Sequence, residues 1–214
     1  MMSPAAPKPE GLRARKRRAT ENAIELSAVS LALEHGVENV TVEAICEGAD
    51  ISRSTFFNYF ASRDYAIVGR AVSLPEGTEA FTILDSCPED LTLGTFRLLF
   101  AAIGHNYVNS DVARMRTQLI MEQPLVSRMA SATILESASA MIITAAAWLE
   151  ANPQHAKLDS PIREASLAVT LMHGVITTQM SEWMASSGDT TAEESDFARV
   201  MDEYRILLGA TPAA

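Results

Sequence analysis

Apolar residues recur at helical spacing over most of this chain, and the alternation typical of strands is hard to find. Residues 20–35, for example, place Ile24, Ala28 and Leu31 on one helix face, and Gly36 then supplies a stop. Ala, Leu, Ser and Glu are the commonest residues, and Ala, Leu and Glu favour helices. The pattern therefore predicts an all-α protein.

Residues 40–63 predict a short helix, a tight turn and a second short helix. Thr41 and Ser52 precede the two segments and suit the N-cap position. Phe56 and Phe60 lie four residues apart and so share one side of the second helix. Its opposite face is polar and carries Arg53, Ser54, Thr55 and Asn58. A small helix with apolar anchors behind and hydrogen-bonding side chains in front suits insertion into a DNA major groove.

The rest of the pattern divides the chain into three parts. Ser62 caps a fourth helix over about 64–73, and Pro75 and Gly77 indicate a linker over 74–89. Long helices are expected over 90–109, 111–121, 124–151, 160–186 and 191–208. We therefore predict a disordered basic arm (1–18), an N-terminal three-helix helix-turn-helix DNA-binding domain (19–73) and a C-terminal helical bundle (74–214) for dimerisation.

The charge distribution agrees with that division. The net charge is −10, which taken alone argues against nucleic acid. Residues 1–70, however, hold nine Lys or Arg and nine Asp or Glu, while the remainder holds eight and eighteen. Six of those first nine basic residues lie between Lys8 and Arg18. A DNA-facing end on an acidic body is the expected arrangement, with the arm either contacting phosphates or serving as a solubilising tail.

Residues 20–70 resemble the TetR family of transcriptional regulators. The motifs that carry the resemblance, in chain order, are Glu34-His35-Gly36, Val40-Thr41-Val42, Ile45, Ile51-Ser52-Arg53-Ser54-Thr55-Phe56-Phe57-Asn58-Tyr59-Phe60 and Ser62-Arg63. The resemblance implies a ligand-responsive repressor that binds a palindromic operator as a dimer. Beyond residue 70 only length and helical character match the family.

The resemblance also implies the DNA-binding residues. Thr41, Tyr59 and Arg63 would bind backbone phosphates, and Arg53, Ser54, Thr55 and Asn58 would face base edges or flanking phosphates. Phe57 stands where the family often has Tyr. A phenyl ring cannot donate to a phosphate, so its expected contact is a thymine methyl group or a sugar.

Candidates for an effector pocket come from the C-terminal part, because the family usually binds a small molecule there. They are apolar, aromatic or histidine side chains that suit an adaptable cavity: Phe96, Phe100, His105, Tyr107, Met115, Leu119, Met141, Trp148, Met172 and His173. Ordinary core packing is the alternative for each of them. His105 and His173 lack a partner at metal-ligand spacing, so no metal and no cofactor are predicted.

The remaining expectations concern partners and class. No nucleophile elbow, phosphate loop or paired-histidine motif is present, so no enzyme is predicted. We expect double-stranded DNA, a second copy of the chain and a small effector as partners, a cytoplasmic location with reduced Cys46 and Cys87, and no membrane association. The alternatives are a helical carrier or enzyme with a non-functional helix-turn-helix, and a DNA-binding dimer without an effector.

Overall fold

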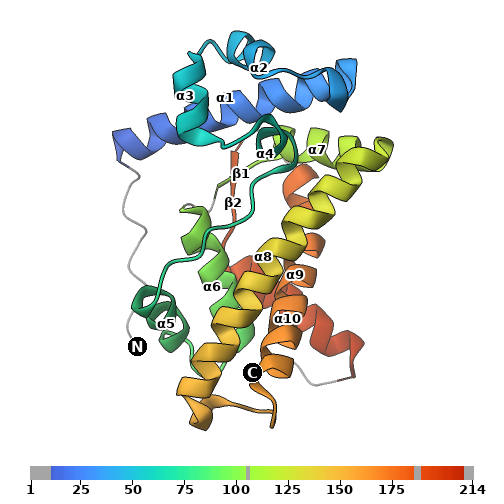
Figure 1. Cartoon of the computed structure of the whole chain (residues 1–214). Coiled ribbons are helices and arrows are strands. Elements are labelled where there is room, and N and C mark those ends of the chain that lie inside the picture. Colours follow the sequence, from blue (N-terminus) through green and yellow to red (C-terminus); the bar gives the residue numbers. More distant parts are fainter. Residues whose placement is uncertain (1–10, 105–106, 186–188, 210–214) are drawn as a thin grey trace.

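The computed structural model describes residues 11–104, 107–185 and 189–209 (Figure 1). Within those residues the chain forms ten α-helices, two short 3-10 helices and one two-stranded ribbon. The predicted all-α class is confirmed. Figure 1 shows a small group of helices, α1 to α4, above a body formed by the longer helices.

The upper group, which we call the head, contains α1 (Leu12–His35), η1 (Val37–Asn39), α2 (Val42–Gly48), α3 (Arg53–Tyr59) and α4 (Arg63–Val68). Three hydroxyl caps fix where its short helices start. Thr41 accepts from the Ala44 amide at 3.1 Å and Ser52 from the Thr55 amide at 3.0 Å. Ser62 likewise caps α4. All three caps were predicted, because each satisfies an amide that a helix start leaves without an intrahelical partner.

Two helix boundaries in the head differ from prediction. Helix α1 begins at Leu12 instead of Thr20, so the basic residues from Arg13 to Arg18 belong to a helix and not to an irregular arm. Arg and Lys are good helix formers, which explains the extension. Helix α4 ends at Val68 instead of residue 73 because Gly69 adopts a φ of 90°.

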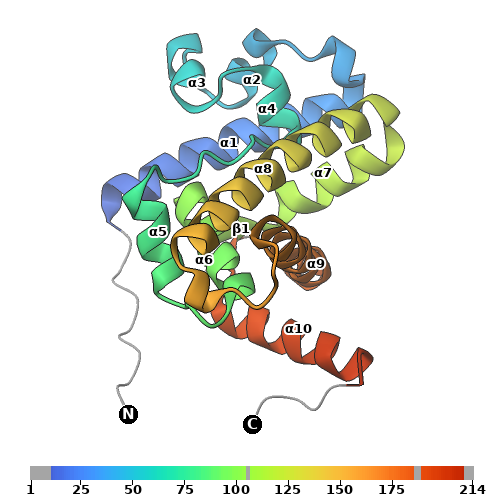
Figure 2. The ribbon, with the colours of Figure 1, turned by 60° about the horizontal axis from the view of Figure 1, so that its bottom comes forward.

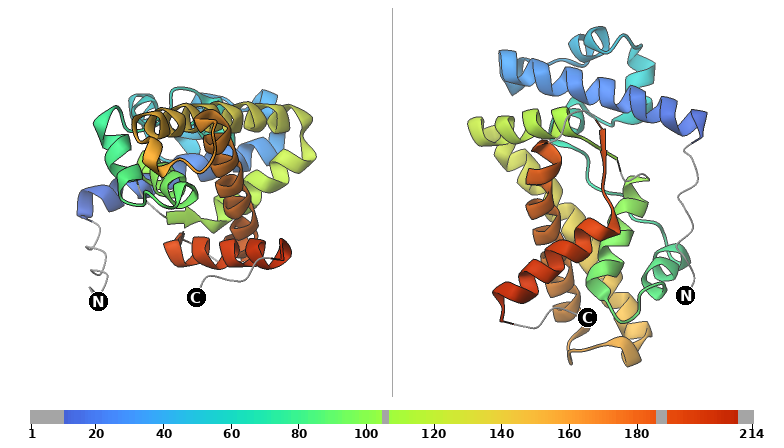
Figure 3. Two further views of the ribbon diagram at one scale, coloured as in Figure 1. Left: turned by 90° about the horizontal axis from the view of Figure 1, so that it is seen from below. Right: turned by 180° about the vertical axis from the view of Figure 1, so that it is seen from behind.

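The body contains α5 (Thr78–Asp85), α6 (Leu91–Ile103), β1 (Tyr107–Asn109), α7 (Ser110–Glu122), α8 (Pro124–Ala151), η2 (Pro153–His155), α9 (Pro161–Ala185), β2 (Asp189–Thr191) and α10 (Glu194–Leu207). Helix α5 lies inside the predicted linker. Strands β1 and β2 pair antiparallel, with Tyr107 opposite Thr191. Seen from behind, α10 starts beside α6 and runs obliquely across α9 (Figure 3).

The prediction of helix was wrong over β1 and at Thr191, the last residue of β2. Helix α6 stops at Ile103 because Gly104 takes a left-handed conformation, with a φ of 84°. Helix α10 starts only at Glu194, where a capping box between Glu193 and Asp196 fixes its first turn. The residues after α6 and before α10 therefore pair as β1 and β2. About eighty residues separate them in sequence, and helical periodicity cannot predict such a pairing.

The hydrophobic core crosses from head to body. Phe56 and Phe60 of the head share one cluster of buried residues with Val112 and Leu119 of α7 and Val126 of α8. A second cluster joins α6, α8, α9 and α10, and Figure 2 shows how these helices gather below α1. Helix α7 also packs along α1. The head is therefore packed on α7 and α8 of the body.

By length and composition, α8 is long and apolar enough to span a membrane, with a mean hydropathy of 1.5 in its most apolar window. Among the described helices it alone passes that test. A single helix of this kind is weak evidence for a membrane protein, because core helices of globular proteins also pass.

Candidate nucleic-acid interface and ligand cavity

Helix α3 presents a polar surface from a rigid support. Phe56 and Phe60 are buried, with ring centroids 6.0 Å apart. Ser54, Asn58 and the ring of Phe57, which is 47% exposed, lie at the surface of the same helix. Burying two phenyl rings holds the helix firmly, since a buried Phe→Ala change typically costs about 3–5 kcal/mol. The predicted split between an anchoring face and a polar face is present.

Arg53 does not project alone into solvent. Its guanidinium forms an ion pair with the carboxylate of Glu43 on α2, and it lies 5.5 Å from the centre of the Phe57 ring. Both members of the ion pair are exposed. Arg53, Glu43 and Phe57 thus form one surface cluster, and Glu43 is the member that the sequence motif did not identify.

The hydroxyl groups at this surface already serve the fold. Thr41 caps α2, and the Thr55 hydroxyl hydrogen-bonds the Ser52 hydroxyl at 2.8 Å. Arg63 donates to the carbonyl oxygens of Glu38, at 3.3 Å, and of Val40. The Arg63 side chain therefore ties the start of α4 to the segment that enters α2.

A basic groove adjoins α3. Five residues of α1 and two of α3 line a cavity of about 720 Å³: Leu12, Arg13, Lys16, Arg17, Thr20, Asn58 and Tyr59. Arg13, Lys16 and Arg17 are exposed, so their charges face the groove and the surrounding solvent. Because α1 extends to Leu12, these cations stand beside the end of the polar helix. The sequence indicated a basic arm, and the helix fixes its position next to Asn58 and Tyr59.

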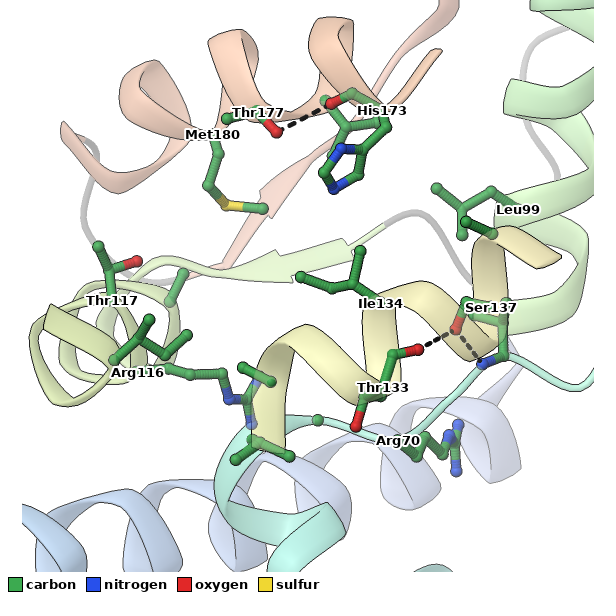
Figure 4. Close-up of a pocket in the computed structure, with 18 of the residues that line it drawn as sticks. Arg70, Leu99, Arg116, Thr117, Thr133, Ile134, Ser137, His173, Thr177 and Met180 are labelled. Atoms are coloured by element: carbon green, nitrogen blue, oxygen red, sulfur yellow. Dashed lines mark hydrogen bonds between the residues drawn. The ribbon is translucent and has the colours of Figure 1, made fainter. Parts of the chain in front are cut away.

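A second cavity, of about 540 Å³, lies in the body (Figure 4). Its walls come from α7, α8 and α9, from Leu99 of α6 and from the segment that follows α4. Ser137 of α8 accepts from the Val72 amide at 3.1 Å and donates to the Thr133 carbonyl at 2.9 Å. The bond from Val72 holds the segment after α4 against α8, where it closes one side of the cavity.

Of the predicted pocket residues, Met141, Met172 and His173 line this cavity. His105 lies outside the described residues. The other predicted residues do not line the cavity and pack in other parts of the protein. The cavity lining instead includes several residues that the sequence did not single out, and their polar members are Arg70, Arg116, Thr117, Thr133, Ser137, Thr177 and Ser181.

The aromatic candidates are held in other contacts. Phe96 packs against Phe100, with ring centroids 4.8 Å apart. Trp148 donates its indole N–H to Asp85 at 2.8 Å, in a position where its side chain is buried. Tyr107 lies beneath the guanidinium of Arg18, 3.9 Å from its ring centre, and so joins β1 to α1.

The two remaining candidates, Leu119 and Met115, belong to the core between head and body. Both lie on α7 at helical spacing, they pack in the cluster that holds the buried residues of α1, and neither lines the cavity. For these two residues the structure shows core packing, which was the alternative to a role in the pocket.

Two arginines of the cavity lining pair with glutamates of α1. Arg116 donates to Glu25 at 2.9 Å, and Arg70 pairs with Glu21 at 3.0 Å. Arg116 also donates to the carbonyl oxygens of Ile67 and Ala66 at the end of α4. A separation of 91 residues divides Arg116 from Glu25, so no local motif could have predicted this contact.

Cys46 and Glu194 are ionisable groups outside the cavity with shifted pKa values. Burial raises the pKa of the Cys46 thiol, which keeps it protonated at neutral pH. Arg97 of α6 hydrogen-bonds Glu194 of α10 and lowers the pKa of that carboxyl. In the described part of the chain, no group of three or more His, Cys, Asp or Glu side chains gathers to hold a metal ion.

Comparison with known proteins found similarity within the head. Residues 26–65 match the family model described as bacterial regulatory proteins, tetR family. The similarity to the TetR family rests on this segment of the head. A 60-residue stretch is 40% identical to the HTH-type transcriptional regulator TcmR of Streptomyces glaucescens. That stretch covers 28% of this chain and 26% of TcmR.

Solved structures resemble this chain more distantly. The repressor NalD of Pseudomonas aeruginosa has a TM-score of 0.40 and 17% identity, with 79% of this chain and 86% of NalD covered. GusR of Salmonella enterica has a TM-score of 0.36 and 16% identity, with 89% and 96% covered. At these scores the likeness carries no inference about ligand or mechanism.

Proposed function

We propose that the chain is a sequence-specific DNA-binding repressor. The observation that carries the proposal is the exposed face of α3, with Arg53, Ser54 and Asn58, beside the cationic groove of α1. Asn suits adenine and Arg suits guanine, while the groove cations suit backbone phosphates. The acidic body repels phosphate, so binding is confined to the head. The family model and the relative TcmR, which match the head, both describe regulators and give no support to an enzymatic role.

On this proposal, the residues divide by role. Arg53, Ser54, Thr55 and Asn58 read base edges, with Phe57 against a thymine methyl or a sugar. Thr41, Tyr59 and Arg63 contact the backbone, and Arg13, Lys16 and Arg17 extend the phosphate contacts along α1. Arg63 in addition holds the entry to α2 through its bonds to two carbonyl oxygens.

Selection of bound duplexes from a random pool, followed by titration at increasing salt, tests the proposal. We expect a preferred palindromic sequence and a linear fall of log K with log salt, with a slope of about −0.9 for each phosphate contact. Arg17→Gln should make that slope shallower by about one contact, whereas Arg128→Gln, an exposed change on α8, should leave it unchanged. No enrichment, or binding that is independent of salt, would contradict the proposal.

We propose that the working form is a homodimer formed through α9 and α10. Leu167 of α9 is 56% exposed and Leu207 of α10 is 82% exposed, so both offer apolar surface to a second copy. Val175, Trp183, Phe197 and Val200 of the same helices are buried within the chain and belong to its own core. Sedimentation of Leu167→Glu against the unchanged protein tests this: a persistent dimer would exclude this surface.

We propose further that the division falls near residue 74, with a DNA-reading head before it and an effector-binding body after it, and that the protein works in the cytoplasm. The 540 Å³ cavity supports the effector role, because its volume lies within the range of small-molecule sites. Thermal shift against a metabolite library tests for such a ligand, since an effector that binds only the folded state raises the melting temperature.

A further inference from the structure

We infer that the body cavity takes an apolar small molecule that carries one anionic group, and that the anion binds at Arg116. The inference deepens the effector role proposed above and rests on it. Three observations support it: the charges in the lining, the unused donors of Arg116 and the apolar character of the opposite wall.

The lining carries positive charge and no carboxylate. Among the described residues that line the cavity, the ionisable side chains are Arg70, Arg116 and His173. The glutamates that pair with the two arginines, Glu21 and Glu25, belong to α1 and lie behind the guanidinium groups, outside the lining. A cationic ligand would therefore meet only positive or neutral groups, whereas an anion would meet favourable ones.

Arg116 retains donors for a ligand. A guanidinium has five N–H groups. The Nε group donates to the Ile67 carbonyl at 2.8 Å, and Nη2 donates to Glu25 at 2.9 Å and to the Ala66 carbonyl at 3.4 Å. Both N–H groups of Nη1 donate to none of the described residues. Since the side chain is only 20% exposed, an anion at Nη1 would form a charge-assisted hydrogen bond largely shielded from water.

The opposite wall is apolar and adaptable. Met141, Met172, Met180 and Met184 line the cavity together with Ile134 and Ile176. Figure 4 shows Met180 and His173 reaching down from α9 toward Ile134, while Arg116 extends from α7 toward the segment after α4. Methionine side chains adjust to irregular apolar shapes at little cost. The ligand would place its hydrocarbon or aromatic part among these residues and its acidic group at Arg116.

Binding at Nη1 would bring a second anion to a guanidinium that Glu25 already neutralises. Glu25 therefore repels that anion, and removing its charge should strengthen the binding of an acidic ligand. This consequence separates ligand binding from a purely structural role of the ion pair. A structural pair would lose stability on Glu25→Gln without any gain in affinity.

Two fluorescent probes that differ by one acidic group test the inference. Anilinonaphthalene sulfonate is anionic, and phenylnaphthylamine is its uncharged parent. We would titrate each into the full-length protein without DNA and compare the ratio of their dissociation constants. Glu25→Gln should strengthen sulfonate binding several-fold and leave the uncharged probe unchanged. Arg116→Gln should weaken sulfonate binding about tenfold, as expected for losing a hydrogen bond to a charged group.

Three controls make the test specific. Arg17→Gln removes a cation of the α1 groove and should leave both probes unchanged, which excludes binding of the sulfonate on that surface. Ala138→Phe fills the cavity and should weaken both probes. Ethidium, a cationic aromatic dye, should bind far more weakly than either. Circular dichroism establishes that each variant is folded before it is titrated.

An unchanged probe ratio in folded Glu25→Gln would overturn the inference, as would a preference for ethidium. Because the probes are titrated without DNA, the two proposals fail separately. If the probe ratios shift as expected and no duplex binds, the DNA-binding role is wrong while the cavity assignment stands. If a duplex binds and the ratios do not shift, the assignment of the cavity is wrong.

Discussion

Arg53 at the start of α3 is paired with Glu43 of α2, and both side chains lie on the surface proposed to face DNA. The Glu43 carboxylate binds the Arg53 guanidinium, which the proposed function assigns to a base edge. In the free protein Glu43 therefore opposes binding in two ways, since it repels phosphate and competes for Arg53.

Glu43→Gln should tighten DNA binding several-fold, because Arg53 loses its competitor and the surface loses one negative charge. Fluorescence anisotropy with a selected duplex measures the change. Glu47→Gln removes another exposed carboxylate of the same helix and isolates the general charge effect. Equal effects of the two variants would show that the ion pair does not limit Arg53.

Asn58→Ala should relax sequence preference at one base position, because an Asn amide can make two hydrogen bonds to adenine, worth about 1–3 kcal/mol of discrimination. Tyr59→Phe should instead weaken binding to all duplexes by similar factors, since it removes a phosphate contact. Repeating the duplex selection with each variant measures both effects. An unchanged preference for Asn58→Ala would show that the reading face is assigned wrongly.

Gln123→Leu should destabilise the protein by roughly 1–3 kcal/mol, the range expected when buried polar groups lose their partners. The Gln123 amide donates to the Ala32 carbonyl at 3.0 Å and accepts from the Val37 amide at 3.2 Å. It therefore joins the α7–α8 corner to the end of α1. Urea unfolding measures the loss, with Gln118→Leu on the exposed side of α7 as the control. Equal stability of the two variants would contradict the role of Gln123.

The Arg97–Glu194 contact should make stability depend on pH. Hydrogen bonding from Arg97 lowers the pKa of Glu194 in the folded state. The contact therefore contributes fully above the unfolded pKa of about 4.3, and that contribution is lost as the pH falls through the lower folded pKa. Since Glu194 is about half exposed, we expect about 1 kcal/mol or less.

Denaturation at a series of pH values measures this contribution. The difference in free energy of unfolding between the unchanged protein and Glu194→Gln should be largest near neutral pH and should shrink in acid. Glu136→Gln on α8 removes an exposed carboxylate and should show a much smaller dependence. A difference that grows as the pH falls would contradict the assignment.

The local features of the head could be predicted from the sequence alone. Caps such as Thr41 and Ser52 act within three residues, and the Phe56–Phe60 spacing acts within one helical turn, so both are visible in the printed order of residues. The same holds for helix α8, whose bounds matched because Pro124 opens it and Pro153 follows its end.

Contacts between distant segments were decided only by the tertiary structure. No local sequence pattern predicts three such contacts: the pairing of β1 with β2, the Arg116–Glu25 ion pair and the Arg53–Glu43 ion pair. The cavity also required the fold, because whether Trp148 or Met141 faces an empty space depends on which helices surround it. The sequence by itself determined the helices and the polar face of α3. Packing determined which charges meet, since the energy of a contact depends on spatial distance.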